Sequence, residues 1–581
     1  MTDVRNALLL TLLAAMLLAP AVTAERNFVL GDTLTLIQRP ILNIPSIVIP
    51  GETLRIECQA GAGASAWEVG LFFESHWIIP NITSAVYDAS TLWWTLEVPI
   101  PTPPVFELYD LFVQVDDEGV IEDITENAVR ILPERRSDWY FVHITDTHLP
   151  DHRFSDSGAI PSDSTEVVDL REVIKDINFF NPEFVLLTGD LVNEGELEDY
   201  MEWRQFSRAQ QLLAELEVPL YLSSGNHDLG GWDSTPPSDG TSRRNWWRFF
   251  GWPRLQDPPA GAPSHTQDYT FDYGPVHFIG LEAYINYDYW RYSDYGYYSF
   301  TDAQLDWLDA DLAANDSEAS VLFYHNDFNN EIYLSSLDVD MALWGHIHHD
   351  EGNINSHPYD LATSATCDGK RSYRVIRVSG NTLIPQETLD TGETGDNMLV
   401  AYSPSNDGTQ YAVAGLVSNL HPIPFEHCLL KFVMPADGVD PQLNDGEIVQ
   451  VDEQGGVKIY YVEVSMPAED WHTVVLQLSE PTDAPENMPA YAALMPNYPN
   501  PFNPQTEIRF TLASRMSIRL SVHDATGREI VVLADGEWDG GDHRLEFDGR
   551  DDEGRELPSG LYLSRLWTKD RSFTRKMILL R

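Results

Sequence analysis

Five short polar segments, each lying just past an apolar run, constrain this chain more than any other feature of its sequence. In chain order they are Asp146-Thr147-His148, Gly189-Asp190, Gly225-Asn226-His227-Asp228, His325 and Gly345-His346-Ile347-His348. Apolar runs such as 139–145, 184–188 and 220–223 are typical of strands buried on both faces. These runs alternate with helical patterns. We therefore expect an α/β layered domain over residues 137–390, with its functional loops at the carboxyl ends of the strands.

The residue types in these segments suit a metal site. Aspartate, asparagine and histidine side chains, with no thiolate among them, bind hard or borderline divalent cations such as Mn, Fe or Zn. Two such cations about 3.5–4 Å apart form a clamp for in-line displacement at phosphorus. Together the segments predict a metal-dependent phosphoesterase.

Each segment alone has a plainer interpretation. Asp-x-His also occurs in surface turns and N-caps, Gly-Asp after a strand is usually a turn, and a single histidine such as His325 is more often a core residue. His346 and His348 are more specific, because alternate residues of an extended segment point to the same side. All five segments in order, each at a strand end, favour the metal site.

The regions around this domain have the patterning of β-domains. Short alternating runs broken by Pro, Gly and Asp predict an immunoglobulin-like β-sandwich at 25–136 and a second β-sandwich at 391–480. A linker rich in Pro and Ala is expected at 481–495, followed by a last β-sandwich at 496–581. The chain is therefore expected to be multidomain.

Residues 1–24 have the features of a secretory signal peptide. Arg5 precedes an apolar run from Ala7 to Leu18, and Val22-Thr23-Ala24 fits the small-residue cleavage pattern. The alternative is a buried N-terminal helix. Because no later apolar stretch reaches the length of a membrane span, we expect an exported protein without a transmembrane segment.

The chain is strongly acidic, with 91 Asp and Glu against 36 Lys and Arg and a formal net charge of −55. Such a surface repels nucleic-acid phosphates and anionic lipids at long range, so a nucleic-acid polymer is not expected as a substrate. Small phosphoesters stay compatible with this charge, because two bound cations would make the site locally positive.

Three cysteines, Cys58, Cys367 and Cys428, match neither a disulfide framework nor a zinc-binding pattern. In an oxidising compartment one disulfide, for example Cys367–Cys428, is the alternative. None of the three is expected to act as a nucleophile.

Residues 139 to about 385 resemble the calcineurin-like metallophosphoesterase superfamily through all five polar segments. The resemblance implies a four-layer α/β/β/α sandwich that holds two divalent cations, with Mn, Fe and Zn open as the metals. The implied ligands form two sets that share a bridging Asp190: Asp146, His148 and His348 for one cation, and Asn226, His325 and His346 for the other. A hydroxide shared by both cations would attack phosphorus.

Two further residues are the candidate catalytic groups. His227 resembles the family's histidine that binds no metal and either protonates the leaving oxygen or stabilises its charge. Asp228 is expected to orient this imidazole and to support it electrostatically.

The residue identities within the segments indicate which subfamily the chain resembles. Asp-Thr-His-Leu, Gly-Asp-Leu-Val and Gly-Asn-His-Asp are most similar to class III cyclic-nucleotide phosphodiesterases and bacterial glycerophosphodiesterases. Purple acid phosphatases carry a metal-binding tyrosine where this chain has Asn193, which counts against that branch. We expect a small phosphodiester as the substrate. A phosphomonoesterase or nucleotidase and a catalytically silent surface-binding protein are the alternatives.

Substrate recognition is expected in the insert between Asp228 and His325. Arg243, Arg244 and Arg248 lie among Trp and Phe residues, and arginine pairs with phosphate through two hydrogen bonds. The alternative is a helix whose aromatic side chains pack inward while its arginines face solvent.

The last segment begins Asn497-Tyr498-Pro499-Asn500-Pro501 and ends in an alternating strand. It resembles the C-terminal sorting module of proteins exported through the bacterial type IX secretion system. The resemblance implies contact with that machinery and a place at the surface of, or outside, a Gram-negative-type bacterium. A purely structural β-domain is the alternative.

Overall fold

The computed structural model describes most of the chain. The described residues are 34–149, 165–193, 199–229, 241–251, 267–282, 300, 302–326, 332, 334–391, 398–479 and 492–579, the last range with gaps at 496, 499, 501, 513–514, 525–527 and 570–571. The signal peptide expected at 1–24 lies outside them. The chain divides into two compact units, one holding most residues up to Glu393 and the other mainly Thr394–Arg581. Across the described ranges, no helix combines the length and the apolar character of a membrane span.

The first unit begins with two β-sheets. One has the order β1-β3-β7-β6 and the other β2-β9-β8-β4-β5. Their strands are β1 Ile37–Arg39, β2 Ser46–Val48, β3 Thr53–Cys58, β4 Ser65–Phe73, β5 His76–Ile78, β6 Ser84–Asp88, β7 Trp93–Pro99, β8 Leu108–Asp116 and β9 Val120–Ile131. The period-2 pattern explains these strands. In β3, for example, Leu54 and Ile56 are buried, while Thr53 and Arg55, which alternate with them, are exposed.

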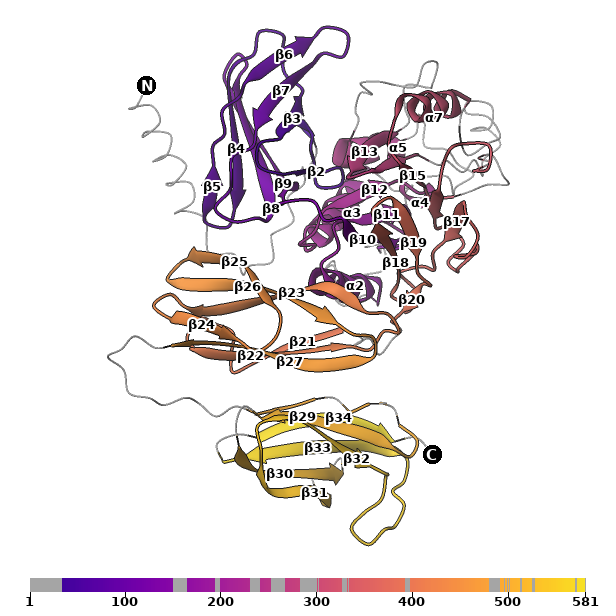
Figure 1. The fold of residues 1–581 in the computed structure, drawn as a ribbon. Coiled ribbons are helices and arrows are strands. Elements are labelled where there is room, and N and C mark those ends of the chain that lie inside the picture. The colour runs from indigo at the N-terminus through magenta and orange to yellow at the C-terminus, as the bar shows by residue number, and fades with distance from the viewer. Residues whose placement is uncertain are drawn as a thin grey trace. The chain divides into compact units, whose positions relative to one another are not determined.

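A second pair of sheets follows in the same unit (Figure 1). The first has the order β12-β11-β10-β18-β19, with β20 paired to β18, and the second runs β13-β14-β15-β16-β17. Their strands are β10 Asp138–Ile144, β11 Val185–Thr188, β12 Leu220–Ser223, β13 Tyr269–Tyr273, β14 Val276–Gly280, β15 Ala319–Phe323, β16 Met341–Trp344, β17 Tyr359–Ala362, β18 Ser372–Ser379, β19 Thr382–Pro385 and β20 Leu389–Asp390.

Helices connect β10 to β11, β11 to β12 and β14 to β15. β10, β11 and β12 are parallel neighbours, as are β14, β15, β16 and β17. The helices of this region are α2 Thr165–Phe180, α3 Asp199–Leu213, α4 Asn226–Leu229, α5 Thr241–Phe250 and α7 Asp302–Ala314. Val167, Leu170 and Ile174 of α2 are buried on one helix face. Leu308 of α7 packs with Leu322 of β15, so α7 covers the second sheet.

Aromatic side chains hold the two sheets face to face. Phe141 of β10 meets Phe278 of β14 edge-on with ring centroids 5.3 Å apart. Tyr221 of β12 stacks on Phe271 of β13 at 3.5 Å. These rings fill the space between the sheets. The carboxyl ends of the parallel strands of both sheets lie at one shared edge of the core, where the ends of β11 and β15 and of β10 and β16 are in contact.

The second unit is built from strands. Its first part has sheets of order β21-β22-β27-β24 and β23-β26-β25, and its last part has β28-β29-β32 and β31-β30-β33-β34. The strands are β21 Met398–Ser403, β22 Ala412–Asn419, β23 Phe425–Pro435, β24 Val439–Leu443, β25 Glu447–Gln454, β26 Val457–Met466, β27 Asp470–Ser479, β28 Ala492–Leu494, β29 Thr506–Leu512, β30 Met516–Asp524, β31 Glu529–Trp538, β32 Gly541–Phe547, β33 Gly560–Thr568 and β34 Ser572–Leu579.

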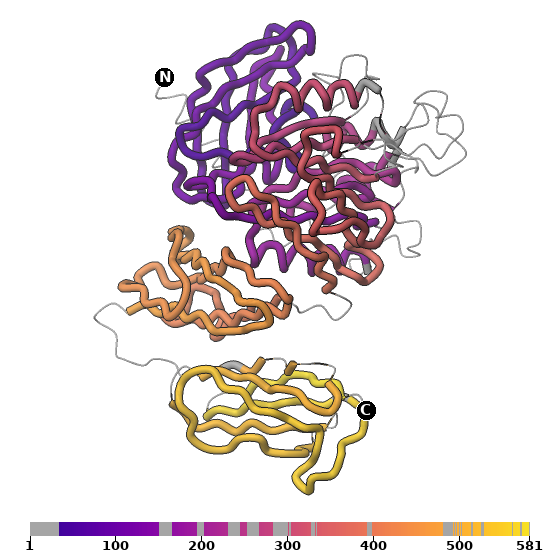
Figure 2. The backbone as a smooth tube through the Cα atoms, turned by 45° about the vertical axis from the view of Figure 1, so that its right-hand side comes forward, coloured from indigo at the N-terminus to yellow at the C-terminus, as the bar shows by residue number. Residues whose placement is uncertain are grey.

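The last part of the chain is a small β-unit with its own core. Phe510 of one sheet shares a buried cluster with Leu520 and Leu566 of the other. Figure 2 shows these strands, in yellow, running back and forth. β28 pairs with β29, although Ala492–Leu494 fall inside the segment expected as a linker. Strand pairing therefore begins before Asn497. The described structure as a whole is multidomain and mostly β.

Candidate metal centre

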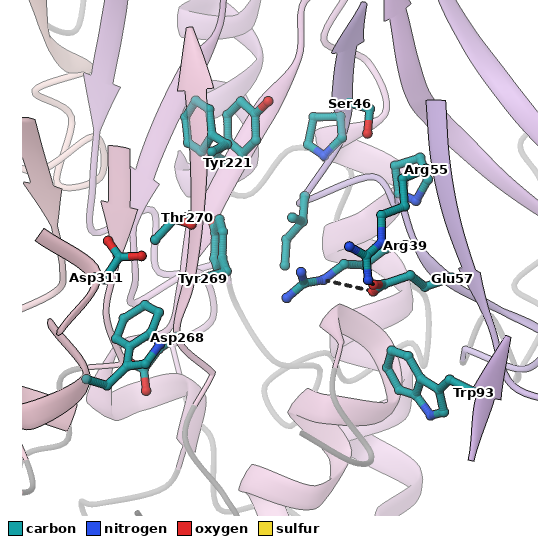
Figure 3. Close-up of a pocket in the computed structure, with 15 residues that line it drawn as sticks. Arg39, Ser46, Arg55, Glu57, Trp93, Tyr221, Asp268, Tyr269, Thr270 and Asp311 are labelled. Carbon is teal, nitrogen blue, oxygen red and sulfur yellow. Dashed lines mark ion pairs between the residues drawn. The ribbon is translucent and has the colours of Figure 1, made fainter. Parts of the chain in front are cut away.

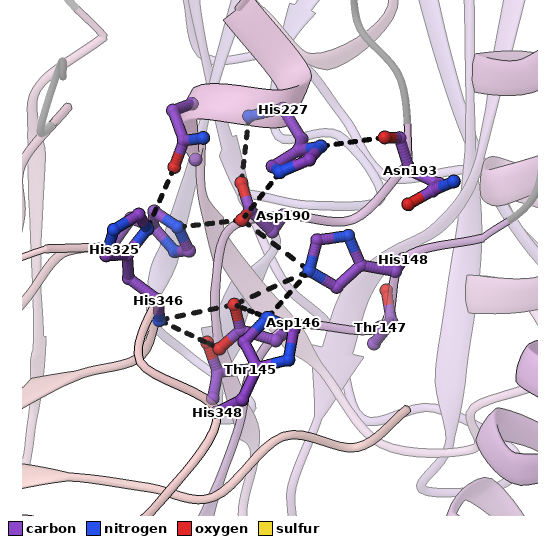
Figure 4. A network of polar contacts seen from close by, with 12 residues as sticks. Thr145, Asp146, Thr147, His148, Asp190, Asn193, His227, His325, His346 and His348 are labelled. Carbon is purple, nitrogen blue, oxygen red and sulfur yellow. Dashed lines mark hydrogen bonds and ion pairs between the residues drawn. The ribbon is translucent and has the colours of Figure 1, made fainter. Parts of the chain in front are cut away.

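The five polar segments meet at the shared edge of the two central sheets (Figure 4). Each segment follows a strand directly, and α4 carries the one that follows β12. The residues brought together are Asp146 and His148 after β10, Asp190 after β11, His227 in α4, His325 after β15, and His346 and His348 after β16. Asn226 of α4 joins them through a contact of 3.1 Å with His346 Nδ1, and Asp228 of α4 accepts a hydrogen bond from the Gly225 nitrogen beside them. All the ligand residues inferred from sequence thus lie in one cluster.

The backbone around the cluster is unusual. Among non-glycine residues with positive φ are Asp146 at 52°, Asp190 at 48° and His346 at 71°. Such values are uncommon for these residue types and cost free energy, and they concentrate at functional sites. Three of the candidate ligands therefore lie in strained backbone.

Two glycines of these segments are required by close contacts. A Cβ atom on Gly345 would lie 1.9 Å from Thr145 Oγ1, and one on Gly225 would lie 2.2 Å from Asp190 Oδ1. No side chain fits at such distances. These glycines let the loops approach the carboxylates of Asp146 and Asp190.

One group of ligand atoms forms around His148. Its Nε2 lies 3.0 Å from His348 Nε2, 3.7 Å from Asp146 Oδ1 and 3.6 Å from Asp190 Oδ2. Asp368 Oδ2 lies 3.0 Å from His348 Nδ1. Because a carboxylate only accepts, Nδ1 of His348 carries the hydrogen and its Nε2 is free to bind a cation.

A second group forms on the other side of Asp190. Asp190 Oδ2 lies 3.0 Å from His325 Nε2, and His346 Nδ1 lies 3.1 Å from Asn226 Oδ1. His325 Nδ1 donates to the carbonyl oxygen of Thr188 at 2.7 Å, which leaves Nε2 facing the Asp190 carboxylate.

This donor set fits divalent cations. The His325 Nε2 and the anionic Asp190 oxygen are held this close by a positive charge between them, either a proton on Nε2 or a bound cation. Two ligands each about 2.1 Å from a cation and at right angles are about 3.0 Å apart, which is the separation seen here. The ligand atoms of Asp190, His325 and His346 all lie within 4.8 Å of one another.

The comparison with known families agrees with this geometry. Residues 140–350 match the family model described as calcineurin-like phosphoesterase. They form a calcineurin-like phosphoesterase domain. The match supports phosphoric ester hydrolysis as the chemistry of this domain.

Two curated relatives share parts of the phosphoesterase domain. A probable cyclic nucleotide phosphodiesterase of Rhodococcus erythropolis is 24% identical over 34% of this chain and 56% of that protein. Another, of Vesicomyosocius okutanii, is 28% identical over 15% of this chain and 32% of that protein. The chain thus spans about half of the first relative and a third of the second. A purple acid phosphatase from yellow lupin, Lupinus luteus, is 13% identical over 65% of this chain and 69% of that chain, with a TM-score of 0.32.

Neighbouring charged groups of the cluster shift one another's pKa values. Burial opposes ionisation of Asp190, yet His325 and His148 lower its pKa to about 2. Burial also disfavours a charged His325, but Asp190 raises its pKa to about 9. Burial and the neighbouring His325 lower the pKa of His346 to about 4. Asp190 is therefore anionic at neutral pH.

His227 lies beside both groups. Its Nδ1 is 2.7 Å from the carbonyl oxygen of Asn193, so Nδ1 carries the hydrogen, and its Nε2 lies 3.9 Å from Asp190 Oδ2. Its ring also meets the His148 ring edge-on at 4.7 Å. A ligand atom of His227 lies within 4.8 Å of those of His148 and Asp190, so the geometry is also open to metal binding by His227.

Asp228 makes contacts other than those expected. Its carboxylate accepts hydrogen bonds from the backbone nitrogens of Gly225 at 2.8 Å and Val192 at 3.1 Å. These bonds hold two ligand-bearing loops in place, while the His227 imidazole hydrogen is donated to the Asn193 carbonyl oxygen. Burial and the charge of Asp190 raise the pKa of Asp228 to about 7.

The arginines proposed to contact substrate lie on α5. Side chains of Arg243 and Arg244 fall outside the described residues. Arg248 is exposed, donates to Asn245 Oδ1 at 3.0 Å and lies over the Trp203 ring. Trp246, Trp247, Phe249 and Phe250 are buried. For Arg248 the structure therefore favours the packed-helix alternative.

A separate cavity of about 430 Å³ lies between the N-terminal strands and the phosphoesterase domain (Figure 3). Arg39 and Arg55 line it beside Glu57, with Arg55 2.9 Å from the Glu57 carboxylate. Tyr221 and Tyr269 line the opposite side. None of the described candidate ligands lines this cavity.

Sequence reasoning missed the loop after β17. Asp368 contacts His348, and Cys367 lies with His148 and His348. All three cysteines are buried free thiols, so the Cys367–Cys428 bridge left open by the sequence is not formed. The position of Cys367 and Asp368 after a strand was a usable signal. However, Thr366-Cys367-Asp368 contains no histidine and follows a short strand of mixed composition.

Proposed function

We propose that this chain is an exported phosphoesterase that hydrolyses small phosphate esters at a two-cation centre and prefers diesters. The observation that carries the proposal is the position of Asp190. Its Oδ2 lies 3.6 Å from His148 Nε2 on one side and 3.0 Å from His325 Nε2 on the other. A carboxylate in this place serves two cations at once.

Each of the two ligand groups would hold one cation. Asp146, His148, Asp190 and His348 would hold one, and Asp190, Asn226, His325 and His346 the other. Cations bound there supply Lewis-acid activation of water and of the phosphoryl oxygens. The oxygen and nitrogen donors suit Mn, Fe or Zn.

His227 would handle the proton of the leaving group. Its Nδ1 hydrogen is held by the Asn193 carbonyl, so the second proton of an imidazolium is carried on Nε2, which faces the cluster. From Nε2 it can pass to the oxygen that leaves phosphorus. Asp228 acts as a positioning residue that holds the Gly225 and Val192 loops.

Two observations support a diester substrate. Both curated relatives are named probable cyclic nucleotide phosphodiesterases. In addition, Asn193 stands three residues after Asp190, at the place where purple acid phosphatases are expected to carry a tyrosine ligand, and it uses its backbone carbonyl to hold His227.

The decisive experiment compares hydrolysis of bis(p-nitrophenyl) phosphate and p-nitrophenyl phosphate by Mn-loaded protein. We expect diester turnover that Asp190→Ala abolishes and His227→Ala reduces about 10²–10⁴-fold. His357→Ala, at an exposed histidine of the same domain, is the matched control and keeps full activity.

Other outcomes select the alternatives. Turnover of the monoester alone would make the enzyme a phosphomonoesterase or nucleotidase. A protein that binds no metal under metal-replete conditions and turns over neither ester would be the surface-binding protein instead.

Export is the remaining part of the proposal. Residues 1–24 would direct secretion, and residues 496–581 would engage type IX secretion machinery and place the enzyme at or outside the surface of a Gram-negative-type bacterium. In a host with that machinery, the full chain should reach the medium or cell surface. A chain ending at residue 480 keeps residues 1–24 and should be retained in the periplasm, and its release in equal amount would argue against the sorting role.

A further inference from the structure

Cys367 is fixed next to the first cation group by its own backbone. Its nitrogen donates to the Asp146 carbonyl oxygen at 3.1 Å, and the nitrogen of Thr366 donates to that of Thr145 at 2.9 Å. The loop after β17 therefore runs along the end of β10, where Asp146 and His148 begin the ligand cluster. A side chain at position 367 can reach that cluster without any movement of the loop.

The sulfur lies within ligand distance of two imidazoles. The Sγ of Cys367 and ring nitrogens of His148 and His348 all lie within 4.8 Å of one another. Metal–sulfur bonds of about 2.3 Å and metal–nitrogen bonds of about 2.0–2.1 Å allow S–N separations from about 3.1 Å at right angles to about 4.4 Å in line. Shifts of a few tenths of an ångström bring all three atoms onto one cation.

Two contacts of His348 suit a cation at this place. The His348 Nδ1 hydrogen is taken by Asp368 Oδ2 at 3.0 Å, which leaves its Nε2 as a ligand atom. That Nε2 faces Nε2 of His148 at 3.0 Å, and two imidazole nitrogens approach so closely when a cation binds both or one is protonated. Cys367 itself is 2% exposed and a free thiol.

We propose that Cys367 supplies a thiolate ligand to the cation held by His148 and His348. The proposal rests on the metal centre of the proposed function and adds one donor to it. Binding breaks the S–H bond, releases one proton to solvent and forms one metal–sulfur bond, with no change of oxidation state. A sulfur donor makes this position softer than the other and favours Zn, Fe or Co over Mn or Mg.

The test is a titration of the metal-free full chain with Co²⁺. A thiolate bound to Co²⁺ gives an intense charge-transfer band in the near ultraviolet, whereas nitrogen and oxygen ligands do not. We expect the band in the wild type, its loss in Cys367→Ser, and its retention in Cys428→Ser, a buried cysteine of the other unit. We also expect the Zn²⁺ affinity of Cys367→Ser to fall at least about tenfold while its Mn²⁺ affinity changes less.

The outcomes separate this inference from the proposed function. Metal binding and ester hydrolysis by a wild type that shows no band with bound Co²⁺ would overturn the thiolate alone. A band that persists in Cys367→Ser would do the same. A wild type that binds no metal would overturn both proposals. If Cys367→Ser fails to fold, a Cys58→Ser/Cys428→Ser chain, in which Cys367 is the last thiol, must still show the band.

Discussion

Asp190 Oδ2 lies 3.0 Å from His325 Nε2, which joins the end of β11 in one central sheet to the end of β15 in the other. The same oxygen lies 3.6 Å from His148 Nε2. Asp190 is thus the residue through which the two halves of the cluster meet, and both carboxylate and imidazole are buried. A change at Asp190 should therefore affect both cation positions.

Asp190→Asn should lose metal from both positions, because a neutral amide is a poor bridge between cations. We expect fewer than two bound ions by elemental analysis and at least about a hundredfold lower turnover. Asp338→Asn, at an exposed site of the same domain, is the control. Full metal content in Asp190→Asn would contradict the shared-carboxylate assignment.

Gly345→Ala should displace the loop that carries His346 and His348. Its Cβ would lie 1.9 Å from Thr145 Oγ1 and 2.5 Å from Asp146 Oδ2. We expect a loss of about 1–3 kcal/mol in unfolding free energy together with weaker metal binding. Gly63→Ala, where a Cβ meets nothing within 4 Å, should be nearly neutral. Equal effects at the two sites would show that the close approach at Gly345 is relieved elsewhere.

His277 should make the stability of the first unit depend on alkaline pH. Burial alone would lower its pKa, but hydrogen bonds to Asp272 at 2.6 Å and Asp311 at 2.8 Å raise the pKa from its ordinary value of 6.5 to about 9. Because the pKa is higher in the folded than in the unfolded state, protonated His277 stabilises the fold fully below pH 6.5. That contribution is lost as the pH rises to about 9.

Urea midpoints measured from pH 6 to 9 test this dependence. The wild type should lose roughly 1–3 kcal/mol across the window, allowing for solvent screening at Asp272. His277→Gln should be less stable at pH 6 and nearly flat between pH 6.5 and 9. His357→Gln should keep the wild-type slope. An unchanged slope in His277→Gln would exclude this group as the source.

Asp368→Asn should weaken metal binding although Asp368 is not itself a proposed metal ligand. The Asp368 carboxylate holds the Nδ1 hydrogen of His348 at 3.0 Å and so fixes the ring with Nε2 toward the cluster. Loss of such a partner lowers metal affinity about 10–100-fold. Asp368→Glu should recover part of the affinity, which a purely structural role in the loop would not predict. Affinity equal to wild type in Asp368→Asn would show that His348 is oriented by other contacts.

Much of the central domain could be predicted from local patterns. The buried strands at 139–145, 184–188 and 220–223 are short apolar runs, and the structure has β10, β11 and β12 there. The one-sided pattern of Val167, Leu170, Ile174 and Ile177 became the buried face of α2. These elements follow from side-chain periodicity and need no knowledge of distant partners.

Several site contacts had no such local signal. Asp228 follows His227 directly, which suggested that it orients that ring, yet its carboxylate bonds the backbone of Gly225 and Val192. Arg248 suggested phosphate binding, yet it lies over Trp203 beside Asn245. In both cases the partner is set by how separate segments pack, and residue type alone does not specify it.

The order of residues along the chain specifies which carboxylates, amide and imidazoles end the buried strands, because polar residues directly after apolar runs must emerge at the strand ends. Their grouping into one cluster depends on how the two sheets pack. Face-to-face packing of two sheets through Phe141, Phe278, Tyr221 and Phe271 brings the ends of β15 and β16 against those of β10 and β11. The same packing places Cys367 and Asp368 beside His348. These are contacts between residues far apart in the chain, so they depend on the register and packing of whole sheets.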